Sequence, residues 1–189
     1  MRMFAALVPP LDVVEDLDAF LDVRREAAPF RWTLAEHLHV TLAFLAEVPD
    51  RRLDDLVERL GRAAARRTAF PAVVAGGGAF PNPARARVLY AGLDLAEPGR
   101  TELSRLATGC RAAASRAGIA VDGKRFHAHL TVARCGRPTE VTAWVRLLDG
   151  YRGPAWRADR LTLVESHLGE GPRRRPRYEE VGSFPLGRD

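Results

Sequence analysis

Apolar residues recur every three to four positions in four stretches of the chain, which is the spacing of amphipathic helices. In the first stretch Val14, Leu17 and Leu21 share one face, and Pro10 precedes it, where helices commonly begin. Between these stretches, short segments rich in β-branched and aromatic residues predict strands. The predicted helices cover residues 11–25, 50–67, 101–118 and 138–148, and the predicted strands cover 1–8, 38–45, 70–75, 87–93, 126–134, 161–163 and 178–184.

The order of the predicted elements repeats along the chain. Each half has a strand, a helix, a second strand, a helix and two further strands, and the second half begins near Val88. Glycines at 76–78 and prolines at 81 and 83 predict turns, and this region is the candidate hinge. We therefore expect an α+β fold in which residues 1–189 form a single bilobal domain. It would be a duplicated unit with two mainly antiparallel sheets, flanked by helices, around a central cleft.

The second strand of each half carries the same seven-residue pattern. Residues 37–43, HLHVTLA, recur at 127–133 as HAHLTVA, and these segments hold four of the five histidines. Because side chains alternate along a strand, a histidine and the threonine two positions later share one face. The alternation places on the polar face His37, His39, Thr41 and Ala43 with His127, His129, Thr131 and Ala133, and on the apolar face Leu38, Val40, Leu42 and Phe44 with Phe126, Ala128, Leu130 and Val132.

This pattern suits the hydrolysis of a phosphodiester. Side chains two positions apart on a strand start roughly 6.5 Å from each other, so a His–Thr pair can contact one phosphate. Hydrolysis needs one proton taken from the attacking water and one given to the leaving oxygen, and two imidazoles supply both. Threonine hydroxyls can stabilise the non-bridging oxygens. His39 and His129 are therefore the catalytic candidates, with Thr41 and Thr131 as phosphate-binding residues; the residues alone do not say which histidine is the acid.

Two other interpretations of the repeat remain open. A single His-x-Thr strand is most often an ordinary exposed polar face, but two copies in matching element order favour catalysis over a structural duplication. Alternatively, the four histidines could hold a metal ion. A catalytic metal site normally has a carboxylate as ligand or beside the imidazoles, and Glu36 and Glu47 lie outside the two strands. We therefore expect chemistry without a metal and without a cofactor.

The charge of the chain permits a phosphate-bearing substrate. The formal net charge is +5, and Lys124 is the only lysine, so nearly all positive charge is arginine. Arginine grips phosphate with two hydrogen bonds, although a biased genome composition would also enrich it. No segment approaches the roughly 18 apolar residues of a membrane span, and the apolar run at 1–8 is too short for a signal peptide. We expect a cytoplasmic protein without membrane contact.

Taken together, the motifs resemble the 2H phosphoesterase superfamily, and within it the bacterial and archaeal RNA 2′,3′-cyclic phosphodiesterases, also called 2′-5′ RNA ligases. The similarity extends over nearly the whole chain. The matching segments are 1–7 (MRMFAAL), 31–32 (RW), 39–45 (HVTLAFL), 78–81 (GAFP), 87–92 (RVLYAG), Phe126, 129–134 (HLTVAR), 163–168 (LVESHL) and 177–178 (RY).

The resemblance implies a role for each site residue. It makes His39 the proton donor to the leaving 3′ oxygen and His129 the base that activates water, while Thr41 and Thr131 bind phosphate. The product would be a 2′-phosphomonoester, formed without metal. Arg134 matches a phosphate contact of the family, but strand alternation points it away from His129 unless the strand bulges there. Two positions depart from the family pattern: His37, and Ala128 where a proline commonly precedes the second catalytic histidine.

The leading hypothesis is therefore a cyclic phosphodiesterase that takes RNA ends or small cyclic nucleotides as substrates and works as a monomer. A second hypothesis is ligation or hydrolysis of 2′-5′ or other nucleotide phosphodiester linkages. A third is an RNA-end binding protein without turnover, which would not need two titratable groups. Among the aromatic residues, we expect Phe4 and Trp32 to belong to the core, and Tyr178 is a candidate for stacking on a base.

Overall fold

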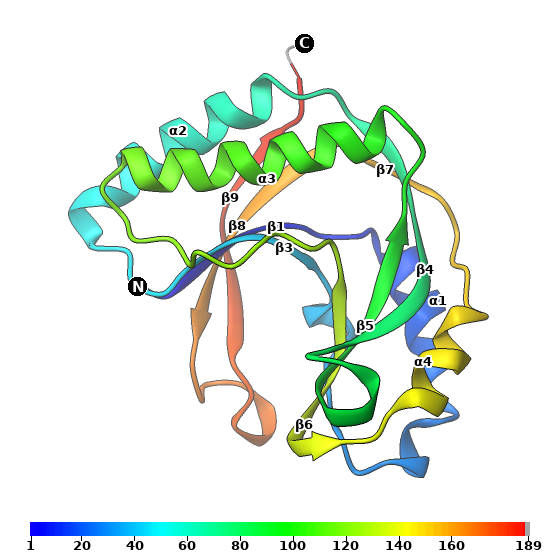
Figure 1. The fold of residues 1–189 in the computed structure, drawn as a ribbon. Coiled ribbons are helices and arrows are strands. Elements are labelled where there is room, and N and C mark those ends of the chain that lie inside the picture. Colours follow the sequence, from blue (N-terminus) through cyan, green and yellow to red (C-terminus); the bar gives the residue numbers. More distant parts are fainter. Residues whose placement is uncertain (188–189) are drawn as a thin grey trace.

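The computed structural model describes residues 1–187 and shows four helices and nine strands in an α+β arrangement (Figure 1). The helices are α1 (Leu11–Asp22), α2 (Leu53–Ala65), α3 (Gly99–Arg116) and α4 (Thr142–Asp149). The strands are β1 (Met3–Leu7), β2 (Arg31–Trp32), β3 (Val40–Leu45), β4 (Phe70–Phe80), β5 (Ala86–Asp94), β6 (Leu130–Thr139), β7 (Trp156–Ala158), β8 (Arg160–His167) and β9 (Arg177–Pro185).

The two expected antiparallel sheets are present, and they are joined into one. The strand order is β7-β4-β5-β6-β3-β1-β8-β9, with β2 paired to β6, and all these pairs are antiparallel. The strands β3 and β6, which follow the two catalytic candidates, meet at the centre through the pair Val40 and Leu130. Each half of the sheet continues outward from this junction, as a duplicated unit requires.

The helices cover different halves of the sheet. In Figure 1, α2 and α3 lie side by side across the top of the molecule, and α2 packs on β9 while α3 packs on β3. On the other half, α4 packs on β4 and β5. The core lies between these helices and the sheet, and it includes Leu56 and Leu60 of α2 with Leu103 and Leu106 of α3. No helix within residues 1–187 is long and apolar enough to cross a membrane.

Several predicted boundaries were wrong. Both central strands begin later than predicted, at Val40 and Leu130, so His39 and His129 stand just before them. The predicted helix at 138–148 begins at Thr142, because β6 extends to Thr139. The structure adds the short strands β2 and β7, which were not predicted.

The glycine run was predicted to be a turn, but it lies inside β4. A Cβ atom on Gly77 would lie 2.4 Å from the Cβ of Leu148, and one on Gly78 would lie 2.2 Å from the hydroxyl oxygen of Tyr90. Glycine is needed at these positions because α4 and the Tyr90 ring pack directly against the strand. The turn comes later, where the Asn82 side chain accepts hydrogen bonds from the backbone N–H groups of Ala84 and Arg85.

Candidate active site

The fold brings the two His-x-Thr segments together at the centre of the sheet. Because β3 and β6 are neighbours, His39 and Thr41 lie beside His129 and Thr131 although the two segments are far apart in the sequence. The two histidines are close enough for the charge of His129 to disfavour protonation of His39. The structure therefore brings the four predicted residues together, as the repeated pattern indicated.

The backbone fixes the orientation of both imidazoles in the same way. The Nδ1 atom of His39 lies 2.7 Å from the carbonyl oxygen of His37, and that of His129 lies 2.6 Å from the carbonyl oxygen of His127. A carbonyl only accepts hydrogen bonds, so each Nδ1 carries a proton. In the neutral ring, Nε2 is then free to accept a proton. The Nε2 atom of His39 also lies 2.9 Å from the hydroxyl oxygen of Thr41.

Aromatic rings enclose both histidines. Phe4 stacks on His39 with ring centroids 4.5 Å apart, and its low exposure of 5% confirms the prediction that it belongs to the core. The ring centroids of Phe80 and Tyr90 lie 5.0 and 5.3 Å from that of His129. The sequence patterns did not single out Phe80 or Tyr90 as site residues, because only the pairing of β4 with β5 and of β5 with β6 brings them there.

Burial makes both histidines weak bases. The pKa of His39 is lowered from 6.5 to about 4, mainly by burial; the hydrogen bond to the His37 carbonyl opposes this, and the positive charges of His37, His129 and Arg134 add to it. The pKa of His129 is also lowered, again mainly by burial. In the free protein at neutral pH both rings are therefore uncharged. A bound phosphate would favour the protonated form of either ring, because opposite charges attract.

Each central strand contains a bulge at the same position of the repeat. Ala6 pairs with Thr41 and Ala5 with Ala43, so Leu42 is the extra residue of β3. In β6 the extra residue is Val132, because Tyr90 pairs with Thr131 and Leu89 with Ala133. A bulge reverses the alternation of side chains beyond it.

The bulges correct the predicted placement of three residues and meet the condition set for Arg134. Phe44 was predicted to be in the core and Ala43 on the polar face, but Ala43 is 4% exposed and Phe44 lines the cleft. In the second copy Ala133 is likewise buried, at 0% exposure, instead of lying on the polar face. Arg134 occupies in the second copy the position that Phe44 occupies in the first, and it lies in the cleft wall. Simple alternation would point Arg134 away from His129, so this orientation depends on the bulge at Val132. The charge of Arg134 acts on both His39 and His129.

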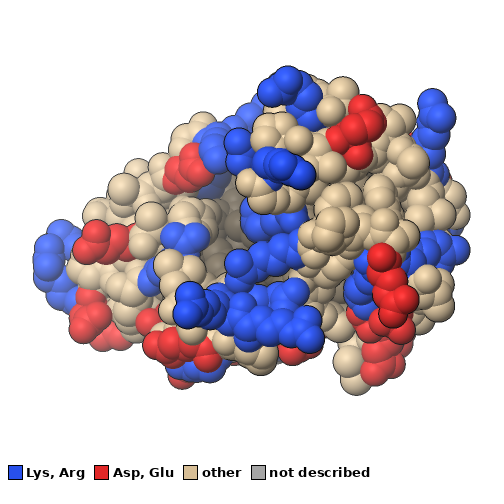
Figure 2. Space-filling view, turned by 90° about the horizontal axis from the view of Figure 1, so that it is seen from below, with Lys and Arg blue, Asp and Glu red and all other residues tan. Residues whose placement is uncertain are grey.

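The cleft beside these residues has a volume of about 870 Å³. Thr41, His129, Thr131 and Arg134 lie in its wall, and His39 adjoins it through its hydrogen bond to Thr41. Figure 2 shows this face of the molecule hollowed, with lysine and arginine side chains along the edges of the hollow. The charged lining residues are Arg85, Arg87, Arg111, Asp122, Lys124, Arg125 and Arg134, and the apolar ones include Phe44, Phe80, Val88, Val121 and Phe126. The cleft thus combines apolar surface for a base with positive charge for phosphate.

Comparison with known proteins identifies the family. The sequence pattern of the family described as "LigT like Phosphoesterase" matches residues 8–90 and again residues 93–173, so that each match contains one His-x-Thr segment. The chain belongs to this family. The double match also agrees with the duplicated architecture of the fold.

Relatives of this LigT-like phosphoesterase support the assignment. An RNA 2′,3′-cyclic phosphodiesterase of Archaeoglobus fulgidus is 35% identical over 137 residues, which cover 72% of this chain and 74% of that protein. The crystal structure of a Thermus thermophilus protein superposes with a TM-score of 0.78 at 30% identity and covers 100% of both chains. E. coli LigT, crystallised in complex with 3′-AMP, has a TM-score of 0.76 at 26% identity and covers 99% of this chain and 98% of that one.

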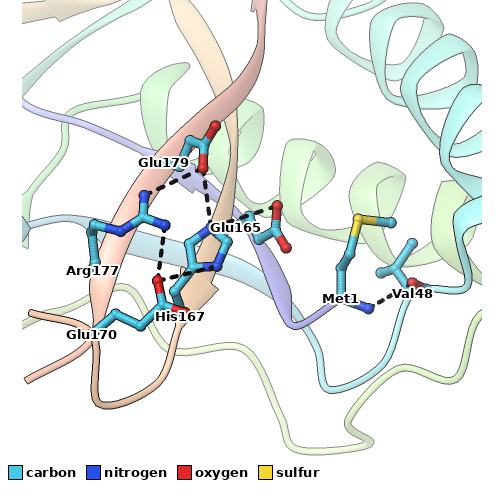
Figure 3. Close-up of polar contacts among 7 residues, drawn as sticks. All are labelled: Met1, Val48, Glu165, His167, Glu170, Arg177 and Glu179. Atoms are coloured by element: carbon cyan, nitrogen blue, oxygen red, sulfur yellow. Dashed lines mark hydrogen bonds and ion pairs between the residues drawn. The ribbon is translucent and has the colours of Figure 1, made fainter.

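In this LigT-like phosphoesterase the four histidines of the two His-x-Thr segments belong, among the described residues, to no group of three potential ligand atoms within 4.8 Å of one another. Within residues 1–187, only Glu165, His167 and Glu179 bring three potential ligand atoms within 4.8 Å of one another. Figure 3 shows this group on β8 and β9, outside the cleft. His167 Nε2 lies 3.1 Å from a carboxylate oxygen of Glu179. The guanidinium of Arg177 donates hydrogen bonds of 2.9 Å to Glu170 and 3.3 Å to Glu179, so its positive charge is shared by these two carboxylates. The group is an ion-pair network at the strand ends.

Proposed function

We propose that this protein hydrolyses the 2′,3′-cyclic phosphate at RNA ends, or in small cyclic nucleotides, to a 2′-phosphomonoester by metal-independent acid–base catalysis. The observation that carries the proposal is the pair of His-x-Thr segments that meet at the junction of β3 and β6. Curated relatives named RNA 2′,3′-cyclic phosphodiesterase support the substrate. The complex of E. coli LigT with 3′-AMP supports the binding of a nucleotide end in the cleft.

In the proposed mechanism the phosphate lies between the two His–Thr pairs. Thr41 and Thr131 donate hydrogen bonds to its non-bridging oxygens as negative charge builds on them. His129 takes a proton from the attacking water through Nε2, and its lowered pKa keeps that atom unprotonated near neutral pH. His39 donates a proton to the 3′ oxygen as the bond from phosphorus to that oxygen breaks.

The role of His39 requires that it gains a proton when the substrate binds. Its pKa of about 4 in the free protein leaves it neutral at pH 7. The cyclic phosphate carries a negative charge, and a negative charge within a few ångströms raises the pKa of an imidazole. Substrate binding would therefore bring the acid into its active protonation state, while the buried environment prevents His39 from being charged without substrate.

Arg134 would neutralise part of the phosphate charge. It lies in the cleft wall on the face that carries Thr131, and its guanidinium lowers the pKa of both histidines in the free protein. Both histidines, both threonines and Arg134 come from one chain, so we propose that the protein acts as a monomer.

The direct test is turnover of a 2′,3′-cyclic nucleotide and of a short RNA with a cyclic end, with and without EDTA. We expect both substrates to be hydrolysed at rates that exhaustive chelation does not change. Loss of activity with EDTA and recovery with one added metal would instead support a metal mechanism. Tight binding of the RNA end without turnover would favour the hypothesis of a binding protein, and joining of RNA ends would favour the ligase.

A further inference from the structure

A second basic surface lies outside the cleft, between α2 and α3. These helices run side by side at the top of the molecule in Figure 1, and a hollow of about 330 Å³ lies between them. Its floor consists of small residues, among them Ala63, Gly109 and Ala113. Its walls carry six arginines, Arg59, Arg62, Arg66, Arg67, Arg105 and Arg116, and among the described residues no acidic side chain lines it. We call this surface the arginine groove.

The carboxylates near the groove do not neutralise it. Asp55 pairs with Arg59 at 2.9 Å, Glu58 pairs with Arg62, and Glu102 lies 3.7 Å from Arg67. The remaining three arginines of the groove form no ion pair with any residue from 1 to 187; they are Arg66, Arg105 and Arg116. Six guanidinium groups around one hollow repel one another, and a bound polyanion would remove that repulsion.

One of these arginines also has an unused hydrogen-bonding group. The Nη1 atom of Arg67 is enclosed and has no hydrogen-bond partner, although Glu102 is its nearest acidic neighbour. A buried guanidinium nitrogen without a partner costs free energy. The groove therefore carries more positive charge than its own chain neutralises.

The α3 helix connects the groove with the active-site cleft. Arg105 and Arg116 face the groove, whereas Arg111 of the same helix lines the cleft. The guanidinium of Arg111 donates hydrogen bonds of 2.8 Å to the carbonyl oxygens of Asp122 and Lys124, and so holds the basic loop that leads to His129. Basic side chains thus border both sides of this helix and the loop at its end.

We infer that the arginine groove binds the phosphate backbone of RNA whose 3′ end lies in the cleft, so that the preferred substrate is a long RNA and not a mononucleotide. This inference rests on the proposed function. The distance along α3 from Arg105 to Arg116 is roughly 16 Å, which is long enough for several successive phosphates. A narrow hollow with arginine on both walls suits a single polymer chain better than a flat anionic membrane surface.

The test compares two variants that each lose two exposed arginine charges. R105Q/R116Q removes them from the groove, and R146Q/R157Q removes them from α4 and β7 on the other half of the molecule. Binding of an RNA of about 30 nucleotides with an ordinary 3′-hydroxyl end is measured by fluorescence anisotropy at several salt concentrations. Each arginine that contacts a phosphate displaces counterions from the RNA, so a variant with two fewer contacts displaces fewer of them. We expect R105Q/R116Q to weaken binding roughly tenfold near 0.1 M salt. We also expect the slope of log K against log salt concentration to become shallower by about 1.4.

The control variant should bind this RNA as the wild type does. Both variants should hydrolyse a 2′,3′-cyclic mononucleotide normally, whereas R105Q/R116Q should raise KM, with little change in kcat, for a cyclic-ended RNA of about 30 nucleotides. Equal RNA binding by both variants would overturn the inference. Binding of the same variants to anionic phospholipid vesicles is measured in parallel, and a defect of R105Q/R116Q with vesicles but not with RNA would also overturn it. The binding assay does not need turnover, so failure of the proposed function would be seen separately.

Discussion

At the scale of residues, the two histidines share one orientation but differ in environment. Each Nδ1 atom is held by the carbonyl oxygen two residues earlier, yet only His39 is stacked on Phe4 and hydrogen-bonded to the hydroxyl of its own threonine. The bulges add a second difference, because they bring Phe44 to the cleft in one copy and Arg134 in the other. The two copies of the repeat thus hold their histidines in the same orientation but in unequal environments.

The first prediction concerns the loss of either imidazole. His39→Ala and His129→Ala should each lower kcat/KM by about 100-fold or more, since each removes one proton transfer. The double variant should lose much less than the product of the two effects, because the histidines act on the same transition state. Steady-state kinetics on a cyclic nucleotide, with circular dichroism to confirm folding, measure this. Full activity of either single variant would exclude the two-histidine mechanism.

The second prediction concerns pH. The proposed reaction needs a neutral His129 and a protonated His39, and both histidines have a lowered pKa in the free protein, to which kcat/KM refers. Activity should fall at low pH as His129 gains a proton and fall at higher pH as His39 loses one. The maximum of kcat/KM should therefore lie below pH 6.5, the ordinary pKa of histidine.

The pH profile of kcat provides the matching control. It reports the complex with substrate, where the phosphate raises the pKa of His39, so its alkaline limb should lie at higher pH than that of kcat/KM. Rates are measured across about pH 4–9 at two substrate concentrations. The rates at saturating substrate give the profile of kcat, and the rates well below KM give that of kcat/KM. A rate that does not vary over this range would be incompatible with histidines as acid and base.

At the scale of elements, close packing of α4 on β4 fixes the half of the sheet that carries Tyr90. Gly77→Ala would place a Cβ atom 2.4 Å from the Cβ of Leu148, and neither backbone can move without disturbing the helix or the strand. We expect a loss of about 1–3 kcal/mol in the free energy of unfolding. Urea denaturation measures this loss.

Gly136→Ala is the control for this substitution. Gly136 is also a strand residue, in β6, but a Cβ atom there would meet nothing within 4 Å. The free energy of unfolding of the Gly136→Ala variant should stay within about 0.5 kcal/mol of that of the wild type. If both variants were equally stable, the glycine run would be a tolerant part of the strand and not a packing requirement.

At the scale of the whole molecule, the proposed orientation of the substrate depends on the joined sheet. The two ribose oxygens of a 2′,3′-cyclic phosphate are both bonded to phosphorus, so either could leave. Attack in line requires the water and the leaving oxygen on opposite sides of phosphorus, each beside its own histidine. The antiparallel pairing of β3 with β6 fixes one His–Thr pair relative to the other, and the cyclic phosphate should bind in one orientation.

The last prediction is therefore a single regioisomer. The product should carry a 2′-phosphate, which phosphorus NMR distinguishes from a 3′-phosphate standard. A 3′-phosphate would reverse the position of the ribose between His39 and His129 while preserving the chemistry. A mixture of the two would show that the His–Thr pairs do not fix the substrate.

The sequence by itself determined the features that depend on local pattern. Apolar periodicity predicted the four helices and most strands, and the repeat of HLHVTLA as HAHLTVA predicted the duplication and the convergence of His39, Thr41, His129 and Thr131. These inferences succeed because strand and helix periodicities, and an internal repeat, are expressed in neighbouring positions of the chain.

Only the tertiary structure decided the features that depend on pairing partners. The bulges at Leu42 and Val132 arise from the registers with β1 and β5, and without those registers simple alternation misplaced Phe44 and left the direction of Arg134 open. In the same way, the local pattern predicts a turn at the glycines of β4, because the ring of Tyr90 and the α4 helix that pack against them are distant in the sequence. Alternation along a strand predicts the face of the sheet on which a side chain lies, but pairing with the neighbouring strands determines the face that it occupies.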